Sequence, residues 1–398
     1  MALGRVGAAT VLAAASGYLV LLLAARALGP GGYAVFAVFW AAYGLVTGAQ
    51  NGQLQETARA IRAAADPARL PAPVPARPWR VNAAIGGGLA VLIAITAPLW
   101  SAAVFDAHRR LSVVLLACGV GSFALYAHLS GVLSGRCAWT SFANLLTVDA
   151  LIRLAGAVLA AGLGWGLTAF LVITVAGSVS PALLMAVSAR VRSVVGLPAD
   201  VTTRTFTAQT LTAMAAAAAS AVVVMGFPVL IGLTQRAADN PAEIGAIILA
   251  VTLTRAPLLV PLNSFQGVLI SRFVAAQDRL AASVLPPLAA VTAVGVAGAG
   301  LAWLIGPWLI ATIFGADYRL GGLTLALFTL GATALALLTI TGAATLAAGA
   351  HRWFAAGWWS ATLASVLLLL VPIDVADRVA LALICGPIAG TICHALRR

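Results

Sequence analysis

Four ionisable residues stand within, or at the end of, apolar runs long enough to cross a bilayer. Asp149 and Arg153 are four residues apart, so they share one face of a predicted helix. Arg255 lies deep in its run with no acidic residue on the same helix face, and Arg26 closes the first run. An ionisable side chain near a bilayer centre costs about 2.5–3.5 kcal/mol, so it usually faces protein or a wet cavity. We expect these residues to carry the chemistry.

Each of the four also has a structural interpretation. Asp149 and Arg153 can neutralise one another and fasten their helix to its neighbours. Arg26 can reach lipid headgroups from a helix end. Arg255 needs a partner from another helix, a carbonyl group, water or an anionic ligand, and we favour the ligand.

Amide side chains interrupt the same apolar runs. Asn51 and Gln53 stand at the end of the second run, and Asn144 shares a predicted helix with Asp149. Further along the chain, Arg255 is followed on its predicted helix by Asn263 and Gln266.

Three prolines fall inside predicted helices: Pro228, Pro257 and Pro261. A proline removes a backbone hydrogen bond, so it kinks a membrane helix and can expose carbonyl groups to a cavity. We interpret these residues either as packing kinks or as hinges for transport.

The elements that must position these residues follow from the composition. Of the 398 residues, 62% are hydrophobic and 9% are charged, whereas an ordinary globular protein has about a quarter charged residues. A membrane-spanning helix needs about 20 apolar residues, and runs of that length fill the chain between short polar breaks. We therefore predict an all-α, polytopic membrane protein with about twelve transmembrane helices.

The first six predicted helices are Val6–Leu28, Gly32–Gln53, Val81–Val104, Leu111–Gly135, Ser141–Leu163 and Gly166–Ala189. The second six are Phe206–Thr234, Ile244–Ile270, Val284–Phe314, Gly322–Ala348, Trp353–Val371 and Val379–Leu396. A polar break at Arg190–Arg204 separates the two sets. We predict an N-terminal six-helix bundle over residues 1–190, a cytoplasmic linker over 191–205 and a C-terminal six-helix bundle over 206–398, a division common in transporters.

The placement of arginine indicates the orientation. All 23 Lys+Arg residues are arginine, and the net charge is +12. If the N-terminus is cytoplasmic, fifteen arginines fall in cytoplasmic segments, six on the opposite side and two within the membrane. The positive-inside rule then predicts cytoplasmic N- and C-termini in the cytoplasmic membrane. The proline-rich connector Arg59–Arg80 is expected to be an irregular cytoplasmic loop, or to touch anionic lipid headgroups.

Several function classes are disfavoured. The arginines are dispersed among interhelical breaks, so no nucleic-acid partner is expected. The four cysteines and four histidines lack the spacing of metal ligands, and we expect neither a metal nor a cofactor. The sequence has no lysine for a phosphate-binding G-x-x-x-x-G-K-[ST] loop and no large extramembrane loop with paired acids, so no enzymatic activity is expected.

Two short segments resemble a known family. Residues 25–36, ARALGPGGYAVF, are similar to the AR-x-LGP-x-x-[YF]-G-x-[YF] turn in the first helical hairpin of bacterial polysaccharide flippases, with Ala34 where glycine is usual. Residues 253–257, LTRAP, through 266–269, QGVL, resemble the eighth-helix region of actinobacterial members. These flippases belong to the multidrug/oligosaccharidyl-lipid/polysaccharide (MOP) exporter superfamily, whose two six-helix bundles form a V that opens inward or outward.

The resemblance implies a flippase that moves a polyprenyl-diphosphate-linked oligosaccharide across the cytoplasmic membrane by alternating access, for cell-envelope polysaccharide biosynthesis. It implies Arg26, Arg153 and Arg255 as headgroup contacts, and Asp149 as the candidate for ion coupling. The implied glycan contacts are Asn51, Gln53, Asn144, Asn263 and Gln266. Besides this lipid-linked glycan, the implied partners are membrane lipids and an envelope polysaccharide polymerase or ligase.

Two alternatives stay open. An ion-coupled drug or small-molecule exporter of the same superfamily would prefer acids in its cavity, and only Asp149 is well placed for that. A polytopic polyprenyl-phosphate-dependent glycosyltransferase would be recognised by its turnover of a sugar donor.

Overall fold

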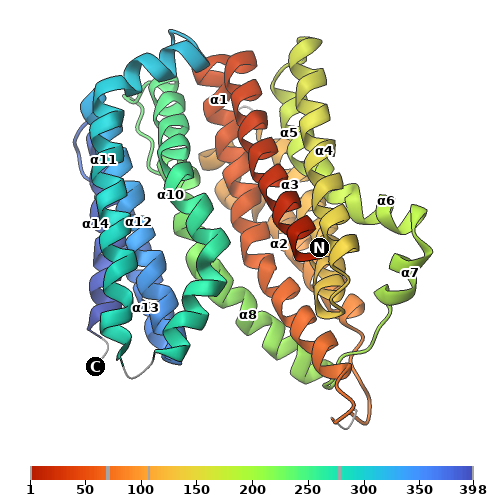
Figure 1. Cartoon of the computed structure of the whole chain (residues 1–398). Coiled ribbons are helices and arrows are strands. Elements are labelled where there is room, and N and C mark those ends of the chain that lie inside the picture. Colours follow the sequence, from red (N-terminus) through yellow and green to blue (C-terminus); the bar gives the residue numbers. More distant parts are fainter. Residues whose placement is uncertain (1, 69–71, 106–107, 277–278, 397–398) are drawn as a thin grey trace. The chain divides into compact units, whose positions relative to one another are not determined.

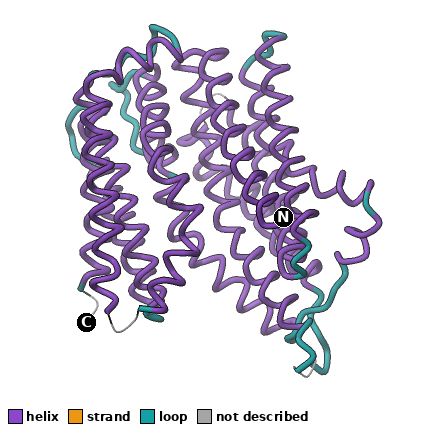
Figure 2. Tube along the Cα trace, in the orientation of Figure 1, coloured by secondary structure: helices purple, strands orange, loops and turns teal. Residues whose placement is uncertain are grey.

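Helices make up most of the chain (Figure 1). The computed structural model describes residues 2–68, 72–105, 108–276 and 279–396, without the side chains of 2, 3, 263–268, 270, 271 and 351. Across those ranges, the only bridge between extended segments pairs Pro75 with Thr202. Figure 2 shows loops mostly as short connections between helices. A chain inside a bilayer must satisfy its backbone hydrogen bonds internally, and helices do so.

The first half of the chain contains α1 (Ala2–Ala64), α2 (Pro78–Phe105), α3 (Arg109–Gly135), α4 (Trp139–Gly162), α5 (Leu167–Ala176), the 3-10 turn η2 (Gly177–Val179), α6 (Ser180–Val187) and α7 (Ala189–Val195). The second half contains α8 (Thr203–Val224), α9 (Phe227–Leu233), α10 (Pro241–Ala275), α11 (Leu280–Phe314), α12 (Gly322–Ala347), α13 (His351–Leu369) and α14 (Val375–Ala395).

The predicted all-α, polytopic architecture is confirmed. Within the described ranges, ten helices are long and apolar enough to cross a membrane. One of them, α1, has 63 residues, far more than the roughly 20 that one crossing needs. It contains a break at Gly29, so it corresponds to two of the predicted helices.

The chain forms two compact units. Unit 1 comprises Met1–Leu28 and Val38–Ala221, and unit 2 comprises Gly29–Ala37 and Val222–Arg398. The chain therefore passes between the units within α1 and again near the end of α8.

Small residues bring the helices of unit 1 close together. A Cβ at Gly131 of α3 would overlap Thr57 and the Leu54 carbonyl of α1, and one at Gly135 would overlap the Ala58 carbonyl. Similarly, Gly52 of α1 lies against the backbone of α8 at Met214. These close approaches are typical of membrane helices that pack through small residues.

Helix α12 is the centre of unit 2. It packs against α10, α11, α13 and α14. Gly295 of α11 lies against Thr333 of α12, and Gly331 of α12 lies against Leu383 of α14. Gly386 and Gly390 of α14 both lie directly against α13.

The break in α1 places a short segment in unit 2. Gly29 has a φ of 66°, a left-handed conformation that favours glycine. Directly after it, the Pro30 carbonyl presses on Gly245 of α10 so closely that no side chain fits there. The buried ring of Tyr33 meets that of Tyr318 edge-on at 6.3 Å. Burial raises the pKa of Tyr318, so its hydroxyl stays protonated.

The segment between α7 and α8 is fastened to the loop between α1 and α2. The amide of Ala76 donates to the Val201 carbonyl at 2.8 Å, and the amide of Ala199 donates to the Ala76 carbonyl at 2.9 Å. Arg77 adds a bond from Nη1 to the Gly196 carbonyl at 2.7 Å. The predicted linker is therefore held on unit 1.

Candidate functional site

The ion pair expected on one helix face is present on α4 in unit 1. Nη2 of Arg153 donates to Oδ1 of Asp149 at 3.0 Å, and both side chains are 17% exposed. The Cζ of Arg153 also lies 5.9 Å from the ring centre of Trp40 and 5.8 Å from that of Tyr43, both on α1. The predicted pairing is confirmed, and it joins α4 to α1.

The turn η2 lies directly against this pair. A Cβ at Gly177 would overlap both Arg153 and Asp149. The next residue, Ser178, has its Oγ 2.5 Å from the Oγ of Ser122 on α3. Because residue 177 is glycine, the pair of Asp149 and Arg153 has the space that it needs. This fit favours a structural role for the pair. The ion-coupling role of Asp149 stays a prediction.

Buried polar side chains line one face of α1 in the part that follows the break at Gly29. Gln50, Gln53 and Thr57 are spaced three and four residues apart, which places them on one face. Gln50 donates to the Val120 carbonyl at 3.1 Å, and Thr57 accepts from Asn82 at 2.9 Å. Gln53 is fully buried, and neither end of its amide has a hydrogen-bond partner among the described residues. Leaving a buried polar group unsatisfied costs about 1–3 kcal/mol, so Gln53 is the amide of unit 1 most in need of a bound polar partner.

Replacing Gln53 by methionine, which has a similar length, removes this unsatisfied amide. We expect Gln53→Met to stabilise the protein by about 1–3 kcal/mol, because the buried polar group is gone, and to slow transport. Thermal unfolding in detergent and a vesicle transport assay measure the two effects. Gln55→Met is the matched control, since Gln55 is exposed on the same helix. A stabilised Gln53→Met variant with the wild-type transport rate would exclude a role in transport.

The remaining predicted contacts are not gathered around Gln53. Asn51 and Asn144 are exposed, and neither makes a side-chain hydrogen bond within the described ranges. Arg26 is also exposed, on α1 just before the break at Gly29. The side chains of Asn263 and Gln266 lie outside the described residues. Of the predicted amides, the structure places only Gln53 in the interior of unit 1.

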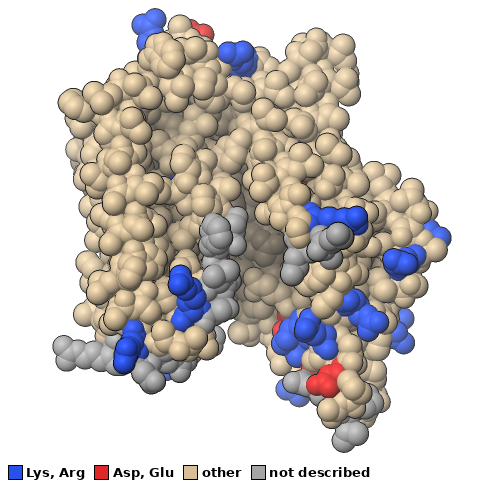
Figure 3. Space-filling view, in the orientation of Figure 1, with Lys and Arg blue, Asp and Glu red and all other residues tan. Residues whose placement is uncertain are grey.

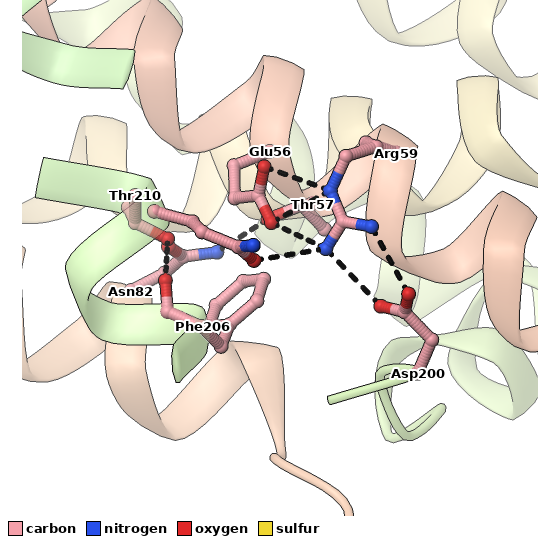
Figure 4. A network of polar contacts seen from close by, with 8 residues as sticks. Glu56, Thr57, Arg59, Asn82, Asp200, Phe206 and Thr210 are labelled. Carbon is pink, nitrogen blue, oxygen red and sulfur yellow. Dashed lines mark hydrogen bonds and ion pairs between the residues drawn. The ribbon is translucent and has the colours of Figure 1, made fainter. Parts of the chain in front are cut away.

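A cluster centred on Arg59 lies at the end of α1 (Figure 4). Its guanidinium donates to Glu56 at 2.6 Å, to Asp200 at 3.0 Å and to Gln209 of α8 at 3.1 Å. Figure 4 also shows the neighbouring bond between Asn82 and Thr57. The predicted irregular connector begins at Arg59, but Arg59 is helical. It ties α1 to the start of α8.

Arg255 lies on α10 in unit 2 and is 7% exposed. Its Nη1 donates at 3.2 Å to the carbonyls of Val223 and Val224, the last two residues of α8. Its Cζ lies 4.9 Å from the ring centre of Phe227. Carbonyls at a helix end have no partner within the helix and carry partial negative charge. Arg255 therefore caps α8, and a carbonyl group is one of the partners expected for it.

The prediction of one helix over Phe206–Thr234 is wrong. The helix breaks at Met225 and Gly226, between α8 and α9. Pro228 stands in the first turn of α9, where a backbone N–H is not needed, so it begins a helix and does not kink one. Pro257 and Pro261 lie inside α10, as predicted. The hinge role of these three prolines stays a prediction.

Unit 2 contains a buried ion pair that no pattern in the sequence indicated. Arg378 of α14 is 1% exposed, and its Nη2 donates to Oδ2 of Asp239 in the loop before α10. Asp239 also accepts from the backbone amide of Arg236 at 2.8 Å, and Arg236 in turn caps the end of α13 through the Leu370 carbonyl. The pair holds α14 to the α9–α10 loop.

These groups offer ionic and hydrogen-bonding recognition. In the described part of the chain, no cluster of three or more His, Cys, Asp or Glu residues could hold a metal ion. What the two units hold are guanidinium groups, at Arg153 and Arg255, and an unsatisfied amide at Gln53. Guanidinium groups match carboxylate and phosphate oxygens in geometry and charge.

Comparison with known proteins identifies close relatives. The protein named "Uncharacterized protein Rv3630" of Mycobacterium tuberculosis (strain H37Rv) is 44% identical over 396 residues, covering 98% of this chain and 90% of the relative. "Uncharacterized protein Rv1510" of the same strain is 45% identical over 390 residues, with the same coverage. The chain belongs to the Rv3630 family. No family model matches it.

Solved structures with the fold of this Rv3630-family member are transporters. An inward-facing multidrug resistance MATE family transporter of the MOP superfamily has a TM-score of 0.74 and 13% identity, covering 100% of this chain and 98% of that one. The lipid II flippase MurJ, in an inward closed conformation, has a TM-score of 0.71 and 12% identity, covering 98% and 86%. The chain is therefore a multi-pass membrane protein with the fold of MOP-superfamily transporters.

A third solved structure concerns polarity. A MOP superfamily transporter from Pyrococcus furiosus has a TM-score of 0.61 and 13% identity, covering 100% of this chain and 95% of that one. It is described with the words "Reverse polarity of binding pocket suggests different function".

Proposed function

We propose that this protein is a flippase that moves a polyprenyl-diphosphate-linked oligosaccharide across the cytoplasmic membrane. The single observation that carries the proposal is the buried guanidinium of Arg255, which brings a positive charge into the interior of unit 2. Two carbonyls and an aromatic ring contact this guanidinium and position it. A diphosphate is the kind of headgroup that such a guanidinium binds.

The balance of interior charge separates this proposal from drug export. The fold serves both a multidrug resistance transporter and a lipid II flippase. An exporter of cationic drugs needs an acid that is available to its substrate. Here the acid Asp149 is already paired with Arg153. The interior therefore favours an anionic substrate.

The proposed path begins with the headgroup. At Arg255 the diphosphate exchanges its hydration for charge-assisted hydrogen bonds. The polyprenyl tail stays in the bilayer while only the head crosses by alternating access. With both termini cytoplasmic, outward movement of the anionic head is favoured by about 2.3 kcal/mol per charge per 100 mV of inside-negative potential. Translocation then needs no ATP.

Purified protein in vesicles tests the proposal. The vesicles contain a fluorescent polyprenyl-diphosphate oligosaccharide, and an impermeant quenching reagent reports the fraction held in the inner leaflet. We expect the protein to reduce the protected fraction of this lipid, but not that of a neutral glycolipid with the same tail. Equal protection with and without protein, or efflux of a cationic dye in its place, would contradict the proposal.

A further inference from the structure

Helices α6 and α7 form an elbow at one end of unit 1. Ser188 is extended between them, and its Oγ accepts from the Val191 amide at 3.3 Å, which caps the start of α7. From α7, Nη1 of Arg192 reaches back to the carbonyls of Met185 and Ala186 at 2.6 and 3.0 Å. These bonds hold the elbow at a fixed angle.

The inner face of the elbow is apolar and packs against the rest of unit 1. Val191 is 1% exposed and belongs to a cluster with Leu129 and Leu133 of α3, Leu145 of α4 and Leu184 of α6. Ala138, in the turn between α3 and α4, packs against the same cluster. The elbow therefore covers the end of α3 and the start of α4, and its other face is left open.

Five exposed arginines lie on α7 or on the segments beside it, and we define them as the basic end surface: Arg62, Arg77, Arg136, Arg190 and Arg192. Hydrogen bonds connect the segments that carry them, since Arg62 donates to Cys137 beside Arg136, and Arg77 donates to Gly196 at the end of α7. Figure 3 shows several blue side chains over this part of unit 1, with few red ones.

Most of the nearby acids do not cancel this charge. Glu56 and Asp200 are both held by Arg59 and have side chains 8% exposed. Asp66 is the exposed acid of this end. The basic end surface therefore keeps a positive excess.

Exposed apolar side chains stand next to these arginines. Val187, at the tip of the elbow, is 82% exposed, and Leu183, one turn earlier on α6, is 48% exposed. Nearby along the chain from Arg77, Trp79 is 42% exposed and lies under the guanidinium of Arg80, 5.3 Å from its ring centre. Apolar residues beside arginines are typical of elements that lie in the membrane interface.

We infer that the basic end surface binds the phosphate headgroups of anionic membrane phospholipids, while Leu183 and Val187 insert into the acyl region beside them. Guanidinium groups match phosphate oxygens geometrically, and juxtamembrane basic clusters are attracted to anionic leaflets. A soluble partner would leave Val187 in water, whereas a lipid surface covers both the apolar tip and the arginines. The inference needs no transport, so it stands independently of the proposed function.

Native mass spectrometry of the full-length protein in detergent tests this binding. The probes are phosphatidylglycerol and phosphatidylcholine with identical acyl chains. We expect the wild type to retain phosphatidylglycerol preferentially, and Arg136→Gln/Arg190→Gln to weaken that binding by about tenfold, from the attraction of two charges. The matched control is Arg109→Gln/Arg110→Gln, because both residues are exposed at the opposite end of α3. This control should retain the lipid as the wild type does.

Two further measurements test the role of the apolar tip of the elbow and distinguish a lipid phosphate from a soluble one. Val187→Ser should weaken the binding of both phospholipids while keeping the preference between them. Inorganic pyrophosphate should not displace phosphatidylglycerol, and efficient displacement would assign the surface to a soluble phosphate compound. Wild-type retention of phosphatidylglycerol by Arg136→Gln/Arg190→Gln would overturn the inference.

Discussion

Arg255→Gln should leave the protein folded and slow translocation of a diphosphate-linked glycan by roughly tenfold to a hundredfold. Glutamine can still donate a hydrogen bond to the Val223 and Val224 carbonyls, so the cap on α8 persists. It has no charge for the diphosphate, however, and hydrogen bonds to charged groups contribute roughly 1.5–3 kcal/mol, where about 1.4 kcal/mol corresponds to a factor of ten. The vesicle assay measures the rate, and thermal unfolding measures the fold.

Companion variants separate capping from charge at this position. Arg255→Lys keeps the charge and should retain more transport than Arg255→Gln, whereas Arg255→Ala should lose both transport and stability. Arg319→Gln is the control, since Arg319 is an exposed arginine of the same unit. If Arg255→Gln transports at the wild-type rate, Arg255 has a structural role alone and the proposed headgroup contact is lost.

Arg378→Met should cause the largest loss of stability in unit 2. It leaves the carboxylate of Asp239 without its guanidinium partner at a site where Arg378 is 1% exposed. Removing one member of a buried ion pair costs about 3–5 kcal/mol, because the other charge stays buried. Thermal unfolding in detergent should show a clear decrease in unfolding temperature, and Arg319→Met should show little change.

A second substitution tests the pairing itself. Adding Asp239→Asn to Arg378→Met removes the stranded charge, and the asparagine oxygen can still accept from the Arg236 amide. The double variant should therefore recover part of the lost stability. Equal stability of Arg378→Met and the double variant would mean that the carboxylate of Asp239 carries no penalty once Arg378 is gone. The single variant Asp239→Asn completes the cycle and gives the coupling energy of the pair.

The helices could be predicted well because the bilayer fixes their length and composition. The run Gly322–Ala348 corresponds to α12 at Gly322–Ala347, and Leu111–Gly135 corresponds to α3 at Arg109–Gly135. The break at Met225 and Gly226 could not be found from hydropathy, because the chain is apolar on both sides. The local signal was Gly226 followed by Pro228, a pattern typical of a helix end and a new start.

In the candidate site, contacts between residues close in the sequence could be predicted, and contacts between distant residues could not. The pair of Asp149 and Arg153 could be predicted because helical periodicity places residues four apart on one face. The capping of α8 by Arg255 could only be given as one of several options, since its carbonyl partners lie on another helix. The pairing of Arg378 with Asp239 had no local signal, because the two residues are 139 positions apart and packing alone brings them together.

The break at Gly29 also affects the order in which the protein can assemble. Residues 29–37 leave the ribosome early, but Gly245 and Tyr318, against which Pro30 and Tyr33 pack, are made only in the second half of synthesis. Contacts between such distant parts of a chain form slowly. A nascent chain therefore carries this segment without its native partners through much of its translation.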